Sequence, residues 1–339
     1  MPGPVSGSAS AQPHHAGADP LPVTVVICAY TMKRWDQTQA AVASVLAQQP
    51  VPAQVLVVID HNPELAALAR RELSVTVLEN AGMPGLSGAR NTGLQAASEP
   101  VTAFLDDDAE ARAGWLASLI EPYRQPGVVG TGGGVVPRWT TVRPSWLPPE
   151  FDWVVGCSYV GLPQQPGVVR NPIGANMSFR TQIALKAGGF NSDIGRVEGL
   201  PRGCEETELA IRVTAQTGTT VMYVPAAAVD HNVPPDRERV SYFLRRCWHE
   251  GQSKAAVVRL VGASSGLDRE RRQAAVIIPM ALWRDLRSLF AGHVAGGKRI
   301  AASMAGLGAS AAGYAAGRLR SVSRADPSRQ PHREAVKAR

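Results

Sequence analysis

Cysteine is scarce in this chain, and its pattern excludes two classes of small protein. The 339 residues contain four cysteines, which stand far apart and form neither a CxxC pair nor a Cys/His cluster with zinc spacing: Cys28, Cys157, Cys204 and Cys247. A disulfide-stabilised secreted domain and a structural zinc domain are therefore excluded. We interpret the cysteines as reduced thiols packed in a cytoplasmic protein.

Long apolar runs are also missing. Residues 1–21 are rich in Pro, Ser and Gly and lack the apolar segment of a signal peptide, so we expect a disordered leader and no secretion. In segments 273–290 and 299–320 charge or glycine interrupts the apolar residues. Neither reaches the roughly 20 consecutive apolar residues that span a bilayer. We interpret both as interfacial helices.

Charge is distributed unevenly along the chain. Residues 237–339 hold 20 Lys and Arg against 7 Asp and Glu, whereas residues 1–236 hold 15 against 21. This pattern predicts an acidic body joined to a basic tail, and the tail lacks the interleaved aromatic residues that stack nucleic-acid bases. We therefore expect an anionic membrane surface, and no nucleic acid, as its partner. The expected location is the cytoplasm, peripheral on the inner face of the membrane.

The first third of the chain alternates between strands and helices. Four β-branched runs predict buried strands: VTVVICAY (23–30), QVLVVID (54–60), SVTVLEN (74–80) and VTAFLDDD (101–108). Helical spacing between them predicts an α/β fold with a mostly parallel sheet and right-handed crossovers. Ligands in such folds bind beyond the carboxyl ends of the strands. Tyr30, Asp60 and Asp106–Asp108 are then expected along one edge, facing one crevice.

The second half is less regular. Its patterns predict helices near 181–187 and 205–216 and a strand at 219–225, and we expect it to complete the same domain and form the acceptor side. The predicted organisation is a leader, a catalytic domain, a basic amphipathic helical extension and a disordered end: 1–21, 22–262, 263–320 and 321–339.

Three aspartates follow the fourth predicted strand. Magnesium and manganese prefer carboxylate oxygens and are typically held by one or two carboxylates plus substrate phosphates. Alternate residues of an extended chain point the same way, so Asp106 and Asp108 are expected to share an ion while Asp107 points elsewhere. The alternative is a solvated acidic loop that caps the next helix.

Two other segments carry candidate catalytic groups. In CEETELAIR (204–212), Glu208 and Arg212 are spaced for an ion pair, whereas Glu206 points away from them and can act as a general base. The alternative is an ordinary acidic residue at a helix start. His231, after a strand and a turn, could complete the ligand set of a metal, or be a loop histidine that binds water. In GLSGARNTGL (85–94), Arg90 offers a polar handle, which is weak evidence for phosphate binding.

Together these motifs resemble the family 2 glycosyltransferases, from about Val23 to Val261. The motifs are VVICAY, VVID, GLSGARNTGL, FLDDDAE, GANMSFR, AGGF, EETELAIR and the histidine in VDH. The resemblance implies a GT-A fold, in which a mostly parallel mixed sheet is flanked by helices. It also implies the following roles: Tyr30 and Asp60 for the nucleotide base, Arg90 and Asp106 for the donor, Asp106, Asp108 and His231 for Mn²⁺ or Mg²⁺, and Glu206 or Glu205 as the base.

The chain departs from the family pattern at two points. Glutamate stands where the family usually has an aspartate base, which leaves the choice between Glu205 and Glu206 open. VVID lacks a second acidic residue, so recognition of the nucleotide base is expected to rest on Asp60 alone. Asn176 in GANMSF and Arg246 and Trp248 in RRCW are expected on the acceptor side. The EETE and RRCWHEGQSKA stretches resemble bacterial and archaeal enzymes that glycosylate lipid-linked or small-molecule acceptors, some of them dolichyl-phosphate sugars.

The implied activity is inverting transfer of a sugar from a nucleoside-diphosphate sugar to a hydroxyl acceptor. A sugar nucleotidyltransferase of the same fold is a weaker alternative, because TMKRW replaces the expected glycine-rich, arginine-containing loop after the first strand. A non-catalytic, membrane-associated scaffold is the other alternative. This alternative is weaker, because a protein that had lost its catalytic activity would have no reason to keep the acidic residues beside one another.

Overall fold

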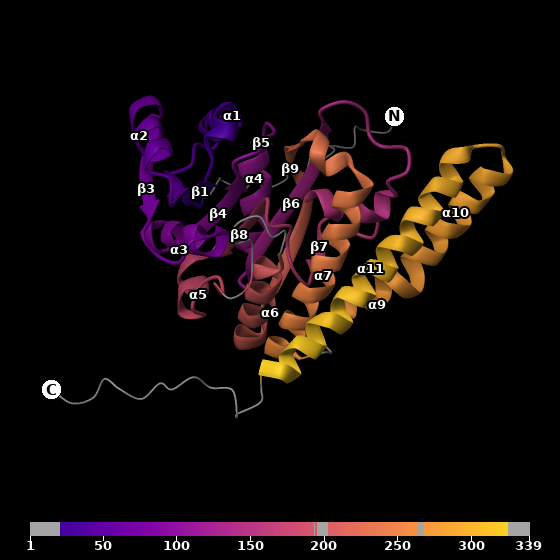
Figure 1. The fold of residues 1–339 in the computed structure, drawn as a ribbon. Helices are drawn as coiled ribbons and strands as arrows, with labels where there is room; N and C mark the ends of the chain where they lie inside the picture. Colours follow the sequence, from indigo (N-terminus) through magenta and orange to yellow (C-terminus); the bar gives the residue numbers. More distant parts are fainter. Residues whose placement is uncertain (1–20, 193, 195–202, 263–266, 325–339) are drawn as a thin grey trace, which may run out of the picture.

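A mixed sheet forms the centre of the computed structural model, which describes residues 21–192, 194, 203–262 and 267–324. Its strand order is β3-β2-β1-β4-β8-β6-β9-β5, with β7 paired to β9 (Figure 1). The strands are β1 Val23–Ala29, β2 Gln54–Asp60, β3 Thr76–Asn80, β4 Val101–Asp106, β5 Ala109–Ala111, β6 Val128–Trp139, β7 Gly167–Val169, β8 Asn176–Arg180 and β9 Thr220–Val233.

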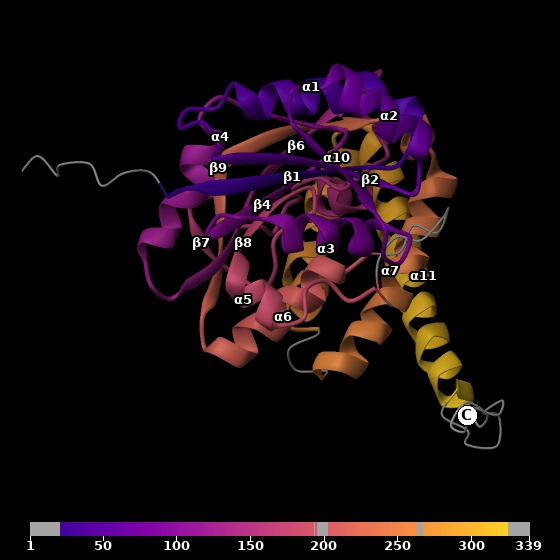
Figure 2. The same cartoon turned by 90° about the vertical axis from the view of Figure 1, so that its left-hand side faces the viewer.

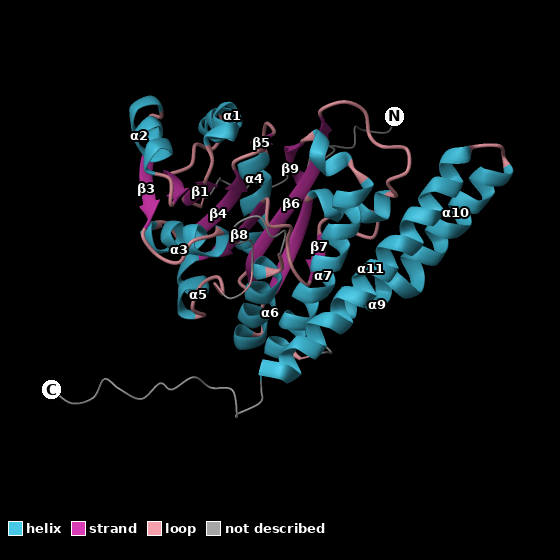
Figure 3. Cartoon of the chain, viewed as in Figure 1, coloured by secondary structure: helices cyan, strands magenta, loops and turns pink. Residues whose placement is uncertain are grey.

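Helices cover both faces of this sheet, and a further set lies beside it (Figure 3). They are α1 Trp35–Leu46, α2 Pro63–Glu72, α3 Leu86–Ala96, α4 Trp115–Ile120, α5 Thr181–Lys186, α6 Glu205–Thr217, α7 Val240–Val261, α9 Asp268–Arg272, α10 Ile278–Phe290 and α11 Val294–Arg324. The predicted α/β fold with a C-terminal helical extension is confirmed.

The first four strands of the sheet position the expected crevice. Strands β1, β2, β3 and β4 pair in parallel, whereas β8 pairs antiparallel with both β4 and β6. Because parallel strands end on the same side, Asp60 at the end of β2 and Asp106 at the end of β4 lie at one edge of the sheet, as does Tyr30 just beyond β1.

Alternation along the strands creates two cores. Val25 and Ile27 of β1 face the core shared with α1, α2 and α4, whereas Val26 between them faces the core shared with α3, α5 and α6 (Figure 2). Successive side chains of a strand point to opposite faces, so a run that is apolar throughout is buried on both. The two cores, one on each face of the sheet, hold the ends of the strands in place.

One strand is longer than the sequence patterns predict, and another is absent from them. The strand expected at 219–225 continues to Val233, and the segment treated as irregular begins with the twelve-residue strand β6. Strand β6 contains several glycines, and glycine has a low propensity for strands, so propensity does not predict this strand. The glycines are required because a Cβ at Gly133 would overlap the Ala227 carbonyl of β9, and one at Gly132 would overlap Pro172.

The C-terminal helices pack on the catalytic body. Helix α11 lies along α7 (Figure 1), and glycines allow the two backbones to touch. A Cβ at Gly251 of α7 would meet the Ser310 carbonyl, and one at Gly313 of α11 would meet the Trp248 carbonyl. The interpretation of 299–320 as an interfacial helix is therefore wrong for the face that contacts α7.

The predicted ends of the chain are only partly described. Helix α11 continues to Arg324, past the expected start of the C-terminal segment at residue 321. The rest of that segment and residues 1–20 lie outside the described residues. Within the described part, none of the helices combines the length and the apolar character that a membrane crossing requires.

Candidate active site

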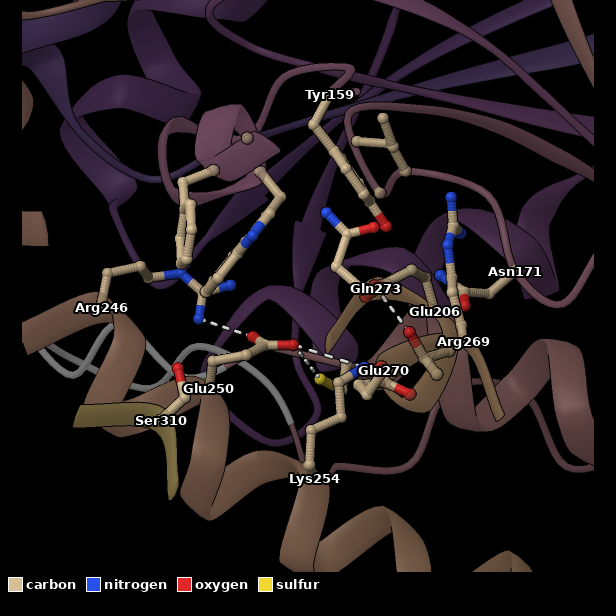
Figure 4. A pocket seen from close by; sticks show the side chains of 18 of the residues that line it. Tyr159, Asn171, Glu206, Arg246, Glu250, Lys254, Arg269, Glu270, Gln273 and Ser310 are labelled. Carbon is tan, nitrogen blue, oxygen red and sulfur yellow. Dashed lines mark hydrogen bonds and ion pairs between the residues drawn. The ribbon is translucent and has the colours of Figure 1, made fainter. Parts of the chain in front are cut away.

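One cavity of about 500 Å³ joins the sheet edge to helices α6, α7, α9 and α11 (Figure 4). It brings together many of the residues singled out in the sequence, although they lie far apart along the chain: Arg90, Asp106, Glu205, Glu206, His231 and Arg246. The other predicted site residues are not among its lining residues: Tyr30, Asp60, Asp108, Asn176 and Trp248.

The acidic edge is built by a turn. Strand β4 ends at Asp106, and Asp107 and Asp108 form the turn before β5, so the expectation of an extended chain is wrong here. Asp106 and Asp108 nevertheless converge, because ligand atoms of both and of His231 all lie within 4.8 Å of one another. Asp107 and Asp108 are each only 3% exposed, which contradicts the alternative of a solvated loop.

His231 belongs to a strand and not to a loop. It lies in β9, where it pairs with Ala109 of β5 and Pro137 of β6, and its side chain is buried. Its Nε2 is 3.2 Å from Asp108 Oδ1, and its Nδ1 is 3.7 Å from Cys157 Sγ. The imidazole is therefore fixed against the acidic edge, and the interpretation as a water-bound loop histidine is wrong.

Two arginines that the sequence reasoning missed also contact this edge. Arg34 Nη1 lies 2.9 Å from Asp107 Oδ1 and 3.1 Å from Asp108 Oδ2, and Arg237 Nη2 lies 3.7 Å from Asp108 Oδ2. Burial opposes ionisation of Asp108, but His231 and the arginines outweigh it and hold its pKa well below the usual range. Burial and the charge of Asp108 raise the pKa of Asp107 to about 7.

Glu205 is committed to an ion pair. Its Oε1 lies 2.8 Å from Arg90 Nη1, while Arg90 Nη2 lies 3.1 Å from Asp106 Oδ1 and donates a 2.8 Å hydrogen bond to the Gly174 carbonyl. Arg90 is 2% exposed. Its guanidinium thus connects α6 to the end of β4. Because Glu205 is held in this ion pair, it is poorly placed to accept a proton from an acceptor hydroxyl.

Glu206, the next residue of α6, has the properties of a general base. It is half-buried, lines the cavity, and accepts a 3.1 Å hydrogen bond from Thr207 Oγ1. Burial, followed by the neighbouring charge of Glu205, raises the pKa of Glu206 to about 7. A carboxylate that titrates near neutrality can both take up and release a proton. The geometry therefore favours Glu206 in the choice that the sequence left open.

The residues expected to hold the nucleotide base lie outside the cavity, along the same sheet edge. Tyr30 is 56% exposed, with the Arg34 guanidinium 5.7 Å from its ring centre. The Asp60 carboxylate accepts hydrogen bonds from the Gly85 amide at 2.8 Å and from Asn80 Nδ2 at 2.7 Å. Asp60 therefore also anchors the start of the GLSGARNTGL segment.

The three residues expected on the acceptor side have different environments. Arg246 lines the cavity, and its guanidinium lies 5.6 Å from the ring centre of Trp153. Trp248 is outside the cavity lining, and its carbonyl faces Gly313 of α11.

Asn176 is fully buried and has a structural environment. Its carboxamide accepts a 2.8 Å hydrogen bond from Trp115 Nε1 and donates bonds of 3.0 and 2.8 Å to the carbonyls of Gly134 and Ala227. These bonds use both of its amide hydrogens, so this geometry does not support an acceptor role for Asn176.

The arrangement matches a known class of fold. The mannosyltransferase PcManGT from Pyrobaculum calidifontis, solved in complex with GDP-Man and Mn²⁺, is similar with a TM-score of 0.54 and 16% identity, over 88% of this chain and 87% of that chain. The fold is therefore that of the GT-A glycosyltransferases.

Sequence comparison defines the family. Residues 24–186 match the family model described as glycosyl transferase family 2. The chain is 33% identical over 239 residues to the glucosyl-dolichyl phosphate glucuronosyltransferase of Haloferax volcanii, covering 69% of this chain and 76% of that protein. It is 25% identical over 266 residues to the succinoglycan biosynthesis protein ExoM of Rhizobium meliloti, covering 73% and 82%. The chain belongs to glycosyl transferase family 2, and it is an enzyme that transfers a sugar.

Proposed function

We propose that this enzyme transfers a sugar from a nucleoside-diphosphate sugar to a hydroxyl group of a lipid-linked or small-molecule acceptor, with inversion at the anomeric carbon. The observation that carries the proposal is that Glu206, with its pKa of about 7, lines the same cavity as Asp106 and His231. The name of the Haloferax volcanii relative, which includes glucosyl-dolichyl phosphate, supports a lipid-linked acceptor.

In the proposed reaction, Glu206 takes the proton of the acceptor hydroxyl as its oxygen attacks the anomeric carbon. The bond from that carbon to the nucleoside diphosphate breaks, and the diphosphate leaves with the electron pair. General-base help of this kind is worth about 10²–10⁴-fold in rate. Arg90 holds Asp106 and Glu205 in place beside the donor, and Tyr30 and Asp60 hold the nucleotide base at the exposed end of the edge.

Asp106, Asp108 and His231 fit a divalent cation. Two carboxylates and one imidazole suit Mn²⁺ or Mg²⁺ with its remaining positions open to phosphate or water. The ligand atoms of these three residues all lie within 4.8 Å of one another, so the same ion could contact all three side chains. Bound there, the cation supplies Lewis-acid stabilisation of the departing diphosphate.

The outer face of α10 supports a peripheral position at the cytoplasmic face of an anionic membrane. Met280, Trp283 and Phe290 are 66%, 61% and 83% exposed, and their spacing places them on one stripe of the helix. Exposed basic residues also occur in α9, α10 and α11: Arg271, Arg272, Arg287 and Lys298. Exposed apolar side chains bordered by cations are typical of interfacial helices.

The membrane proposal has a direct test. Trp283→Glu is expected to reduce flotation with vesicles that contain anionic lipid, because a carboxylate replaces an apolar ring at the interface. The control is Val168→Glu, which introduces the same charge at an exposed position on the sheet. Another tryptophan such as Trp146 is unsuitable, because it packs against a core cluster that the charge would disrupt. Equal flotation of Trp283→Glu and the wild-type chain would contradict the proposal.

A donor screen tests the transferase activity. Purified protein is incubated with individual nucleotide sugars and Mn²⁺ or Mg²⁺, and the released nucleoside diphosphate is measured before and after addition of a chelator. We expect release from at least one donor, and its loss with chelator. Release of pyrophosphate instead would indicate the nucleotidyltransferase alternative, and no turnover or binding of any donor would indicate the scaffold.

A further inference from the structure

Arg34 lies beside two parts of the site that no other described contact joins directly. It ends the short 3-10 helix Met32–Arg34, which follows β1 at the sheet edge. Its Nη1 lies 2.9 Å from Asp107 Oδ1 and 3.1 Å from Asp108 Oδ2. The guanidinium carbon lies 5.7 Å from the ring centre of Tyr30. One side chain is therefore next to both the acidic edge and the exposed ring to which we assign the nucleotide base.

The contacts with the two aspartates use only one of the three guanidinium nitrogens of Arg34. Its Nη2 and Nε donate no hydrogen bond to any residue that the structure describes. The Arg34 side chain is 20% exposed, whereas those of Asp107 and Asp108 are 5% and 4% exposed. A ligand at the sheet edge can therefore reach Arg34 more easily than the two carboxylates.

The two oxygens of Asp108 have different neighbours. Oδ1 lies 3.2 Å from Nε2 of His231, which is another proposed ligand of the cation. Oδ2 lies 3.1 Å from Arg34 Nη1 and 3.7 Å from Arg237 Nη2. A carboxylate can bind a cation through one oxygen alone. Oδ1 is thus available for the cation while Arg34 keeps its contact with Oδ2.

A nucleoside diphosphate bound in this site has to extend from Tyr30, at its base, to the cation, at its phosphates. Arg34 is next to Tyr30 and to the metal ligand Asp108, so it lies along this path. A guanidinium presents pairs of N–H groups in one plane, which match the geometry of phosphate oxygens. The unused Nη2 and Nε offer such a pair.

We propose that Arg34 binds the diphosphate of the donor through Nη2 and Nε, while its Nη1 stays on Asp107 and Asp108. The inference rests on the proposed function, because it adds a donor-binding residue to that same site. The two aspartates repel phosphate, so we expect this contact only when Mn²⁺ or Mg²⁺ compensates their charge.

Calorimetry on the full chain with Mn²⁺ tests the inference. The probes are the nucleoside diphosphates UDP, GDP, CDP, ADP and dTDP. Arg34→Gln should weaken binding of whichever diphosphate the wild-type chain binds by about ten- to a hundred-fold, the usual value of a charge-assisted hydrogen bond. Arg34→Lys should bind more tightly than Arg34→Gln but less tightly than the wild type, because it keeps the charge without the planar fork.

The concentration of Mn²⁺ separates a direct contact with phosphate from a role in orienting Asp108. The loss of affinity in Arg34→Gln should persist when Mn²⁺ is raised until the affinity no longer changes. Full recovery at high Mn²⁺ would show that Arg34 only orients Asp108 for the ion, and would overturn the inference.

A matched variant controls for the loss of positive charge. Lys33→Gln removes one positive charge from the neighbouring exposed position of the same 3-10 helix, and it should bind the diphosphate as the wild type does. Equal affinity of Arg34→Gln and Lys33→Gln would overturn the inference. If Arg34→Gln does not fold, Arg34→Lys takes its place in this comparison, and equal affinity again overturns it.

Failure of the proposed function gives a different result. If the wild-type chain binds none of the five diphosphates with saturating Mn²⁺, the proposed function fails together with the inference. If one of them binds and the Arg34 variants bind it as Lys33→Gln does, only the inference fails.

Discussion

The cavity has two walls of different character. The sheet-edge wall, at the ends of β4, β9 and the start of α6, is rich in acidic side chains and holds Asp106, Glu206 and His231. The helical wall, from α7 to α11, is basic and apolar and holds Arg246, Lys254 and Ile278. We propose that the sheet-edge wall acts on the donor and that the helical wall contacts the acceptor.

The sheet-edge wall should give the largest effect on substitution. Glu206→Gln keeps the shape of the side chain but cannot accept a proton, so the rate of transfer should fall about 10²–10⁴-fold. Affinity for the donor should be retained, because the change leaves the acidic edge intact. Released nucleoside diphosphate and calorimetry measure the two quantities. Normal turnover by this variant would refute the role of Glu206.

The metal ligands should give the next largest effect. Asp108→Ala removes one of the three groups that converge on the proposed cation, so Mn²⁺-dependent affinity for the donor should fall at least about tenfold. Titration of donor into protein with and without Mn²⁺ measures this. Asp230→Ala is a suitable control, since Asp230 lies beside His231 in β9 but pairs with Arg112 on the exposed side. An unchanged Mn²⁺-dependent affinity in Asp108→Ala would remove Asp108 from the metal site.

Substitutions where α11 packs on α7 in the helical wall should change the free energy of unfolding. Gly313→Ala places a Cβ against the Trp248 carbonyl, where α11 touches α7, and should destabilise the fold by about 1–3 kcal/mol. Gly308→Ala, on the same helix, meets open space and should be stabilising by about 0.5–1 kcal/mol, because alanine favours a helix. Denaturant unfolding compares them, and equal stability of the two variants would contradict the close packing of this wall.

Sequence reasoning predicted the sheet-edge wall far better than the helical wall. The strands before Tyr30, Asp60 and Asp106 follow from local runs of apolar residues, and the rule for parallel sheets then places their ends together. The ion pair between Glu208 and Arg212 likewise follows from helical spacing, and it is present at 2.7 Å. Features of this kind depend only on neighbours in the chain.

Contacts between distant segments could not be found in the same way. Arg34 and Arg237 contact the acidic edge from separate segments. Glu270 of α9 pairs with Lys254 of α7 and with Arg170, which follows β7. Only the Arg246–Glu250–Lys254 pairs had a local signal, the spacing of four between these residues in RRCWHEGQSKA. Strand β6 was missed because its glycines serve close packing and carry no strand preference.

The pH dependence of transfer tests most directly whether Glu206 is the base in this cavity. With metal and donor saturating, kcat/KM for the acceptor should fall about tenfold per pH unit as the pH drops below about 7, because protonated Glu206 cannot accept the hydroxyl proton. The residual activity of Glu206→Gln should lack this limb. The same limb in both proteins would show that another group controls the reaction, and would contradict the assignment of Glu206.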